Sequence, residues 1–499
     1  MIVLTEIVIP PDEVYGVKYP PLALACLSTA LKEAGRSCRI VTFEADHQPE
    51  AWVNHVLSLN PSVVGFSVFM GYKLEKAFRL TRLLKQKRPD VPILWGGVHP
   101  SLCPEQTLVE SDVDWVCVGN GESTMVAIAR ALDGEISLDE VPSLVRRVNG
   151  NIVTNPPGLP RRDETYARPD WKSFPVQDFI IEAGPGERIL GFMSSRGCPY
   201  QCGFCYIKAY YGRRWKGAEL DAVQKEMLYL RDQYGVTGFI FLDDLFFANK
   251  KRAVELLRWM AAERLSCHAV DLRLSEVDRE VLETLRLAKT KGVFIGVESA
   301  NDRVLKVMTK GSGTKELHEA MNLLNEYPDL LLWLSCIVGV PTETFEEMNE
   351  TITVAARLSR RPNTMVNLNT FIPLQGTGLY ELSLEHGFRA PTNLEGWTKL
   401  SEARGNTLDH FPGRLTPAQT RYIQRAAHYL RMLYRPYPVT QRNPVKRAIV
   451  TAFRQLAAFR LEHQTLAVPV DMWLYRHLRQ MSQSLKRQEK SPELVEAKV

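Results

Sequence analysis

The chain has 499 residues, of which 45% are hydrophobic and 24% charged, and its net charge is +5 at pH 7. These values are typical of a folded globular protein and exclude a disordered or collagen-like chain. The length predicts two or three domains. No apolar run reaches the roughly 18 residues of a membrane-spanning helix, and the first residues lack the basic segment of a signal peptide, so we expect a cytoplasmic protein.

Cysteine usage and charge distribution add two expectations. The nine cysteines are scattered apart from one close trio, which predicts reduced thiols rather than a disulfide scaffold. The stretch from Arg431 to Arg487 contains eleven Lys and Arg against two acidic residues. The basic character therefore belongs to the C-terminal tail.

Residues 1–140 alternate strand-like and helix-like segments, which predicts a parallel, doubly wound α/β domain. The expected strands lie at 1–9, 38–45, 62–69, 91–98 and 113–119, and clear helical patterns at 21–35 and 72–89. In such a domain the loops at the carboxyl ends of the strands form the ligand site.

The remaining chain divides into three parts. Residues 141–185 are rich in proline and polar residues and are expected to form a linker. Residues 186–390 hold six further strand–helix units, which predict a partial, TIM-like barrel with active residues at its strand ends. Residues 391–499 show helical patterns and no strand signal.

Three cysteines follow the first barrel strand at the spacing C-x3-C-x2-C, in the stretch "CPYQCGFC". They are Cys198, Cys202 and Cys205, with no fourth Cys or His nearby. Structural zinc closes its tetrahedron with four protein ligands, so a zinc site is the weaker interpretation. The stronger interpretation is a 4Fe-4S cluster whose fourth iron is open to a substrate or cofactor.

This stretch resembles the signature of the radical S-adenosylmethionine (radical SAM) superfamily, C-x3-C-x-φ-C, in which φ is an aromatic residue. The resemblance implies that the three cysteines bind three irons and that S-adenosylmethionine chelates the fourth. It further implies that an electron from the reduced cluster cleaves the sulfonium and releases a deoxyadenosyl radical. A barrel would shield that radical from water. An external donor such as flavodoxin or ferredoxin is the expected source of the electron.

The same resemblance implies that residues at the barrel strand ends hold S-adenosylmethionine. These residues are Phe204, Asp243, Arg273, Glu298, Ser299 and Gly339. Most of them also have a structural interpretation. Asp243 and its neighbour Asp244 could cap the next helix, and Ser299 could be an N-cap. Arg273 could belong to a structural ion pair, and Gly339 could only shape the backbone.

The N-terminal domain, taken together with the barrel, resembles the cobalamin-binding class of radical SAM enzymes. The resemblance rests on small residues that follow successive strands in "SVFMG", "GGVHP" and "GNGES". Small residues let the backbone approach a large flat cofactor and its nucleotide tail. The implied cobalamin contacts are Ser67, Gly71, Gly96, Gly97, His99, Gly119, Gly121 and Glu122.

One motif of many cobalamin proteins is missing. They carry D-x-H-x-x-G after the first strand, and its histidine binds cobalt from below, whereas this chain reads "PPDEVYG" there. His47 lies in a different loop and is expected at the surface. If cobalamin binds, its lower face should carry water or a side chain other than histidine. The alternative is a domain that keeps the fold without the cofactor.

The basic tail interleaves Arg and Lys with Leu, Phe, Trp and Tyr at helical spacing. The first interpretation is a helical cap over the barrel, with arginine stems covering apolar surface. The second is an interfacial helix attracted to anionic lipid, which would make the protein membrane-associated. Nucleic-acid binding ranks last, because no RNA-binding module accompanies the charge.

Together these features predict a radical SAM enzyme that binds a 4Fe-4S cluster, S-adenosylmethionine and cobalamin. The commonest reaction of the class that the chain resembles is methyl transfer to an unactivated carbon. A hydrophobic small molecule such as a lipid, isoprenoid or tetrapyrrole is the expected substrate. The alternatives are a radical cyclisation or oxidation without methylation, and a non-catalytic protein that uses the cluster for electron transfer or as a scaffold.

Overall fold

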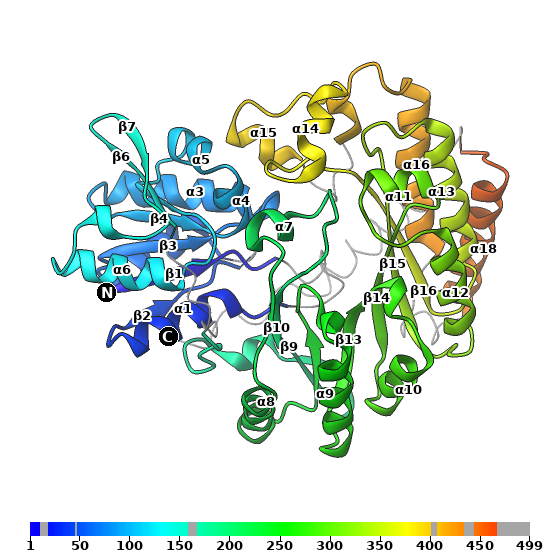
Figure 1. Ribbon diagram of the computed structural model, residues 1–499, viewed down its shortest axis with the longest axis horizontal. Coiled ribbons are helices and arrows are strands. Elements are labelled where there is room, and N and C mark those ends of the chain that lie inside the picture. The colour runs from blue at the N-terminus through cyan, green and yellow to red at the C-terminus, as the bar shows by residue number, and fades with distance from the viewer. Residues whose placement is uncertain (10–17, 45–46, 158–166, 401–406, 434–443, 467–499) are drawn as a thin grey trace.

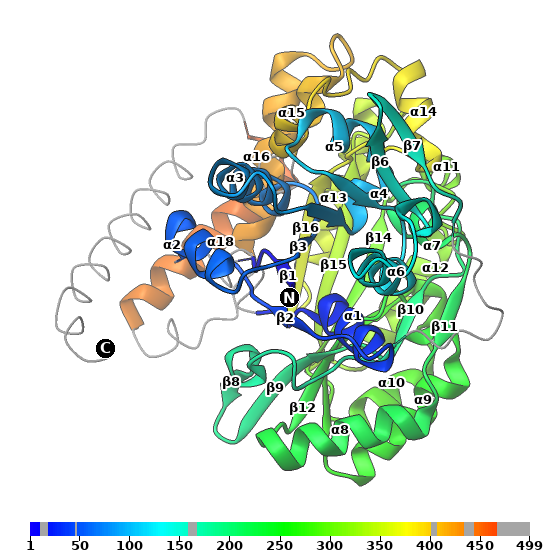
Figure 2. The same ribbon diagram turned by 90° about the vertical axis from the view of Figure 1, so that its left-hand side faces the viewer.

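The computed structural model describes the chain except for residues 10–17, 45–46, 158–166, 401–406, 434–443 and 467–499. Two α/β units lie side by side, each built on a seven-stranded sheet, and further helices follow towards the C-terminus (Figure 1; Figure 2 gives the view after a quarter turn). The predicted fold class is confirmed.

The N-terminal unit is a doubly wound sheet with the strand order β2-β1-β3-β4-β5-β6-β7. Its first five strands in this order run parallel. They are β1 (Ile2–Glu6), β2 (Cys38–Ile40), β3 (Val63–Ser67), β4 (Ile93–Gly96) and β5 (Trp115–Cys117). The helices are α1 (Leu22–Glu33), α2 (Pro49–Ser58), α3 (Tyr72–Lys87), α4 (Val98–Leu102), α5 (Pro104–Glu110) and α6 (Glu122–Leu132). The runs of Val, Ile and Leu in β1, β3 and β4 suit strands that helices cover on both faces.

This sheet extends into the predicted linker. β6 (Leu144–Val148) pairs antiparallel with β5, and β7 (Asn151–Thr154) pairs antiparallel with β6. Leu144 and Val145 are fully buried in β6, so this hairpin belongs to the N-terminal unit. The apolar signal fades here because the rest of the hairpin is only partly buried or exposed at the edge of the sheet.

The central unit is a curled, open sheet with the order β16-β15-β14-β13-β12-β9-β8 (Figure 1). Six of its strands run parallel, and β8 (Ile181–Gly184), also in the predicted linker, joins β9 antiparallel. The parallel strands are β9 (Glu187–Phe192), β12 (Gly238–Phe241), β13 (Ser266–Leu272), β14 (Gly292–Glu298), β15 (Leu331–Val338) and β16 (Thr364–Thr370). The intervening helices are α8 (Leu220–Tyr234), α9 (Lys250–Ala262), α10 (Arg279–Leu287), α11 (Asp302–Val307), α12 (Thr314–Leu324) and α13 (Phe345–Leu358). The six strand–helix units predicted from periodicity are therefore present, and they form a partial barrel.

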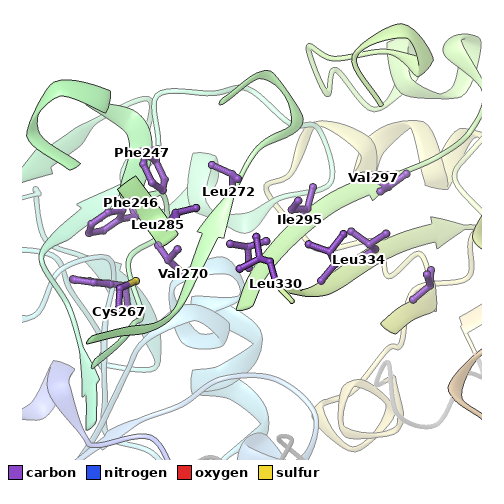
Figure 3. Close-up of a cluster of buried hydrophobic side chains, with 14 of the residues drawn as sticks. Phe246, Phe247, Cys267, Val270, Leu272, Leu285, Ile295, Val297, Leu330 and Leu334 are labelled. Atoms are coloured by element: carbon purple, nitrogen blue, oxygen red, sulfur yellow. The ribbon is translucent and has the colours of Figure 1, made fainter. Parts of the chain in front are cut away.

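The main core of the central unit fills the space between this sheet and its helices. Figure 3 shows Val270 and Leu272 of β13 beside Ile295 of β14 and Leu285 of α10, all fully or nearly fully buried. Burying each such side chain stabilises the unit by about 1.5–3 kcal/mol. The packed sheet gives the loops at its carboxyl edge a rigid base.

The C-terminal helices connect the two units. α14 (Gly378–Glu385) and α15 (Leu394–Lys399) follow β16 and lie across the top of both units in Figure 1. In α15, the Trp397 indole donates to Gln106 Oε1 of the N-terminal unit at 3.0 Å. α16 (Pro417–Leu433) packs on β16 and buries Ile423 and Tyr429 in the barrel core.

The last described helix is α18 (Pro444–Glu462), which packs on α16 and α13. Its Ala457 and Leu461 are buried in the barrel core, whereas Leu456 and Phe459 are 38% and 53% exposed. This part of the tail is a helical cap, in line with the first interpretation of its sequence. Residues 434–443 and 467–499 of the basic tail lie outside the described residues. In the part of the chain that the structure covers, no helix combines the length and the apolar character needed to cross a membrane.

Candidate cofactor sites at the strand ends

The cysteine loop runs between the two units. It follows β10 (Ser195–Gly197), which pairs with β11 (Trp215–Gly217), and it leads into α7 (Tyr206–Tyr211). Figure 1 shows α7 between the N-terminal sheet and the barrel. Gly197 has φ +80°, and a Cβ there would lie 2.1 Å from the carbonyl oxygen of Arg214, so only glycine fits this tight turn.

The three cysteines of this loop are free thiols. Among the described residues, no three Cys, His, Asp or Glu side chains converge closely enough to hold one metal ion. In a 4Fe-4S cluster each thiolate binds a different iron, so the three sulfurs need not meet at a single ion.

The three cysteines of this loop are buried or half-buried, so a metal centre bound there would be partly shielded from water. Cys202 is 8% exposed, and Cys198 and Cys205 are half-buried. Burial raises the pKa of the Cys205 thiol to about 12 and that of Cys198 above its ordinary value. Metal coordination is what deprotonates such thiols.

Asp243 and Asp244, just past β12, hold the start of this loop. Asp243 is 3% exposed and accepts hydrogen bonds from the Ser194 backbone N–H at 2.8 Å and the Ser194 hydroxyl at 2.7 Å, and also from the Ser195 hydroxyl. Asp244 accepts from the Gly197 backbone N–H at 2.7 Å. Neither caps the following helix α9, whose N-cap is Asn249.

A group of buried and half-buried carboxylates lies near this end of the barrel. Burial raises the pKa of Asp244 to about 6, and burial with neighbouring carboxylates raises that of Asp271, at the end of β13, to about 7. Burial likewise raises the pKa of Glu276. Carboxylates crowded together in this way attract a cation. S-adenosylmethionine carries positive charge on both its ammonium and its sulfonium group, so the carboxylates at this end of the barrel suit it.

Arg273 lies against the cysteine loop. Its Nη1 is 3.7 Å from the Cys202 sulfur, and its guanidinium stacks 3.7 Å from the ring centroid of Tyr200. Its Nη2 donates to the Lys310 carbonyl at 2.5 Å. The guanidinium thus contacts a cluster ligand of the predicted site and joins the loop to the end of α11.

Glu298 forms a buried ion pair with Lys310, a residue that the sequence analysis missed. The Lys310 Nζ lies 2.6 Å from Glu298 Oε1, and both side chains are 7% exposed. A bulge at the end of β14 and a φ of +66° aim Glu298 at this partner. A Cβ at Gly296 would lie 2.1 Å from Glu298 Oε1, so this glycine makes room for the pair.

The other predicted S-adenosylmethionine residues lie around this pair or behind it. The Phe204 ring packs with Val340 and Leu379, 5.9 Å from Lys310 Nζ. Ser299 is 1% exposed and its hydroxyl contacts Thr351, while Asn301 is the N-cap of α11. Gly339 has φ +88° and donates its N–H to Glu343 at 2.6 Å. Their contacts with S-adenosylmethionine stay predictions.

A narrow cavity of about 150 Å³ opens at the carboxyl edge of the N-terminal sheet. Leu4, Gly65 and Leu94 floor it on the sheet, and Leu24, Leu27 and Met125 of α1 and α6 wall it. It is smaller than the ~300–1,000 Å³ of pockets that enclose a whole ligand, so it can hold one end of a larger cofactor. Its apolar lining fits an aromatic group such as the base of the cobalamin nucleotide tail.

Glycines keep this cavity open. A Cβ at Gly65 would lie 3.1 Å from Leu4 Cδ2, and one at Gly121 would lie 3.3 Å from Leu27 Cδ2. Gly97 has φ +94°, and its Cβ would lie 2.9 Å from the Val68 backbone. Side chains at these positions would fill the space or strain the backbone, so the glycine pattern suits a bound group.

Six of the eight predicted cobalamin residues line the cavity: Ser67, Gly96, Gly97, Gly119, Gly121 and Glu122. Gly71 is the N-cap of α3, and neither it nor His99 is among the residues that line the cavity. The His99 ring packs 6.4 Å from that of Trp397, and burial lowers its pKa to about 4, so it is uncharged. His47 accepts a hydrogen bond from the Glu44 N–H at the surface. Residues 10–17, which include all of "PPDEVYG", lie outside the described residues.

Residues of the central unit close the mouth of the same cavity. They are Met193, Arg196, Tyr210 and Tyr211. No sequence motif indicated them, because only the packing of the two units brings them to the N-terminal sheet. Arg196 lies two residues before Cys198, so the cavity and the cysteine loop meet.

Two family models match the chain in consecutive regions. Residues 12–129 match the B12 binding domain, and residues 192–355 match the radical SAM superfamily. The first region spans β2 to β5 of the N-terminal sheet, and the second runs from the last residue of β9 into α13 of the barrel.

Three curated relatives are similar to the chain. An uncharacterized methyltransferase of Pyrococcus horikoshii is 27% identical over 86% of this chain and 92% of its own length. An anaerobic magnesium-protoporphyrin IX monomethyl ester cyclase of Cereibacter sphaeroides is 26% identical over 68% of this chain and 56% of its own. A hopanoid C-3 methylase of Methylococcus capsulatus is 22% identical over 61% and 58%. The chain thus spans little more than half the length of the last two.

Among the solved structures with a similar fold is a second kind of relative. It is the radical S-adenosylmethionine methyltransferase TsrM from Kitasatospora setae with cobalamin and a 4Fe-4S cluster bound. It covers 92% of this chain and 99% of its own length at a TM-score of 0.64 and 17% identity. At this identity the similarity concerns the fold.

Proposed function

Since the chain joins a B12-binding domain to a radical SAM domain, and so belongs to the cobalamin-dependent radical SAM class, we propose that it methylates an unactivated carbon of a hydrophobic substrate. The cofactors of this class are a 4Fe-4S cluster, S-adenosylmethionine and cobalamin. When bound, the cluster supplies the electron that cleaves S-adenosylmethionine, and cobalamin supplies a carrier for the methyl group.

One observation carries this proposal: the glycine-lined cavity and the cysteine loop share a boundary. Arg196 lines the cavity and stands two residues before Cys198. The groups that would handle a methyl group and a radical therefore lie on either side of one short loop. A substrate between the two units could meet both.

The protein's own residues would bind, orient and protect the reactants. Cys198, Cys202 and Cys205 would hold the cluster. The carboxylates near Asp271 would attract the positive groups of S-adenosylmethionine, and Arg273 could bind its carboxylate through a planar fork. The curled sheet would exclude water from the radical.

The preference for methyl transfer rests on the relatives. The relative that the chain matches over most of both lengths bears the name methyltransferase, and another bears the name hopanoid C-3 methylase. The second name supports a lipid or isoprenoid substrate. The exposed Leu456 and Phe459 on basic helix α18 are compatible with contact at a lipid surface.

Radical cyclisation of a tetrapyrrole is the second candidate. The similarity to the anaerobic cyclase of Cereibacter sphaeroides, over 68% of this chain, favours it. A cyclase would use the radical without transferring a methyl group.

Methyl-labelled S-adenosylmethionine distinguishes the two candidates. The anaerobically reconstituted protein, with a one-electron donor, would be incubated with lipid extract and separately with a porphyrin ester. A methyltransferase should leave label in the product and form S-adenosylhomocysteine along with deoxyadenosine. Deoxyadenosine without labelled product or S-adenosylhomocysteine would refute methyl transfer and favour the cyclase.

A further inference from the structure

The mouth of the narrow cavity carries a buried ion pair between the two units. Arg196 Nη1 of β10 lies 2.5 Å from Glu122 Oε1 of α6. Arg196 is 9% exposed, although it lies at the junction of the units. Among the described residues that line the cavity, these are the two that carry charge.

The neighbouring polar groups at the mouth are neutral. Tyr210 donates its hydroxyl hydrogen to the Gly119 carbonyl at 2.7 Å. Burial raises the pKa of both Tyr210 and Tyr211, so neither phenol ionises near neutral pH. Burial disfavours the charged form of Arg196, but the Glu122 carboxylate raises its pKa and arginine is not deprotonated in proteins, so Arg196 stays a cation. The cavity therefore has an apolar interior and a cationic group at its entrance.

The nucleotide tail of cobalamin matches an apolar cavity with a cation at its entrance. The tail ends in an aromatic base, which joins through a ribose to a phosphodiester that carries one negative charge. An apolar pocket suits the base, and an arginine fork is the side chain best suited to a phosphate. We propose that Arg196 binds the phosphodiester of the cobalamin tail, so that the radical SAM domain completes the cobalamin site of the neighbouring domain.

Glu122 does not prevent this contact. The guanidinium has five N–H donors in a planar arrangement, so it can bind a phosphate oxygen and keep a carboxylate partner. Glu122 also lies in the first turn of α6, where the helix N-terminus stabilises a negative charge. Glu122 can therefore share the Arg196 guanidinium with the phosphodiester.

The competing interpretation is an ion pair that only fastens the two units. Both interpretations predict that loss of Arg196 harms the protein, but only phosphate binding depends on the tail of the ligand. The inference rests on cobalamin binding and is independent of whether the product is methylated.

The test compares three ligands on reconstituted full-length protein: cobalamin, cobinamide phosphate and cobinamide. Cobinamide has the corrin ring without the phosphate, ribose or base. We expect Arg196→Gln to weaken binding of cobalamin and of cobinamide phosphate by about ten- to a hundred-fold, as for loss of a hydrogen bond to a charged group. Binding of cobinamide should change by less than about two-fold. Equilibrium dialysis with absorption of the corrin measures all three affinities.

Two further variants keep the result interpretable. Arg214→Gln removes an exposed arginine of the wider cleft outside the mouth and should leave all three affinities unchanged. Arg196→Lys keeps the charge without the fork and should lose less cobalamin affinity than Arg196→Gln, which covers the case in which the glutamine variant folds poorly.

Equal weakening of all three ligands by Arg196→Gln would overturn the proposal in favour of a purely structural ion pair. Unchanged cobalamin affinity would overturn it as well. Wild-type protein that binds none of the ligands would refute cobalamin binding itself, and this outcome is distinct from a failure specific to Arg196. Wild-type protein that prefers cobinamide phosphate to cobinamide, with that preference lost in Arg196→Gln, is the supporting result.

Discussion

Replacing Lys310 with methionine should strongly destabilise the barrel. The substitution keeps the length of the side chain but removes the cation that Glu298 faces at 2.6 Å. Both side chains are 7% exposed, so water cannot replace the lost partner. An uncompensated carboxylate would remain at the end of β14.

The geometry sets the size of the effect. At 2.6 Å, two unit charges attract by about 6 kcal/mol at an effective dielectric constant of about 20. Desolvating the two ions costs several kcal/mol each, so the intact pair contributes little net stability. Removing one partner should therefore lower the free energy of unfolding by about 3–5 kcal/mol, whereas Glu298→Met with Lys310→Met should restore most of it.

Urea unfolding of the apoprotein, followed by tryptophan fluorescence, measures these differences. Lys315→Met is the matched control: Lys315 pairs with Glu319 on the surface of α12 and is 82% exposed, so its loss should cost at most about 0.5 kcal/mol. The double variant should regain stability, but because it lacks Glu298, a predicted contact of S-adenosylmethionine, it should bind that cofactor more weakly than the wild type. A Lys310→Met variant as stable as Lys315→Met, or a double variant as unstable as the single one, would refute the reasoning.

Three further predictions test the cofactor sites. Affinity for S-adenosylmethionine should rise as pH increases from 6 to 8, because Asp271 has a raised pKa of about 7 and attracts a cation only when ionised. Titration calorimetry measures this affinity at each pH. The same pH dependence of the affinity in Asp271→Asn would contradict the prediction. Gly97→Ala should lower the melting temperature and abolish cobalamin binding, because the new Cβ would lie 2.9 Å from the Val68 backbone. Gly134→Ala is the control: its Cβ would meet open space, so this substitution should cost only the backbone strain of about 1–3 kcal/mol. Cys202→Ala should lose most of the bound iron and should no longer cleave S-adenosylmethionine. Cys267→Ala removes a thiol of the buried core and should leave the iron content unchanged. Equal iron content in the two variants would exclude Cys202 as a ligand.

The sequence predicted the parts of the protein that depend on local pattern. The strand–helix alternation fixed both sheets, and the spacing of Cys198, Cys202 and Cys205 led to the radical SAM domain, which the family match confirms. The small residues at the ends of β3, β4 and β5 led in the same way to the B12 binding domain. The prediction of an enzyme is confirmed, and the electron-transfer or scaffold alternative is not supported.

Features that depend on packing between distant segments were not predictable. Lys310 follows a short helix rather than a strand, so no strand-end argument pointed to it, and only the fold brings it to Glu298. Arg196 reaches the cavity only because the two units pack together. His99 follows a strand end as expected, but the direction of its side chain depends on how α4 meets Trp397.

The boundaries of the linker were missed for a related reason. β6 pairs with β5 through backbone hydrogen bonds, and its burial of Leu144 and Val145 is too short to give a clear periodic signal. The polar sequence around this hairpin resembles a loop because most of its residues are exposed or only half-buried.

The absorption spectrum of the anaerobically purified protein, reconstituted with iron, sulfide and cobalamin and then gel-filtered, tests the central claim most directly. The two cofactor sites on either side of the cysteine loop predict that corrin bands and the broad iron–sulfur absorption elute together with the chain. Iron–sulfur absorption alone, with all cobalamin in the small-molecule fraction, would contradict the account.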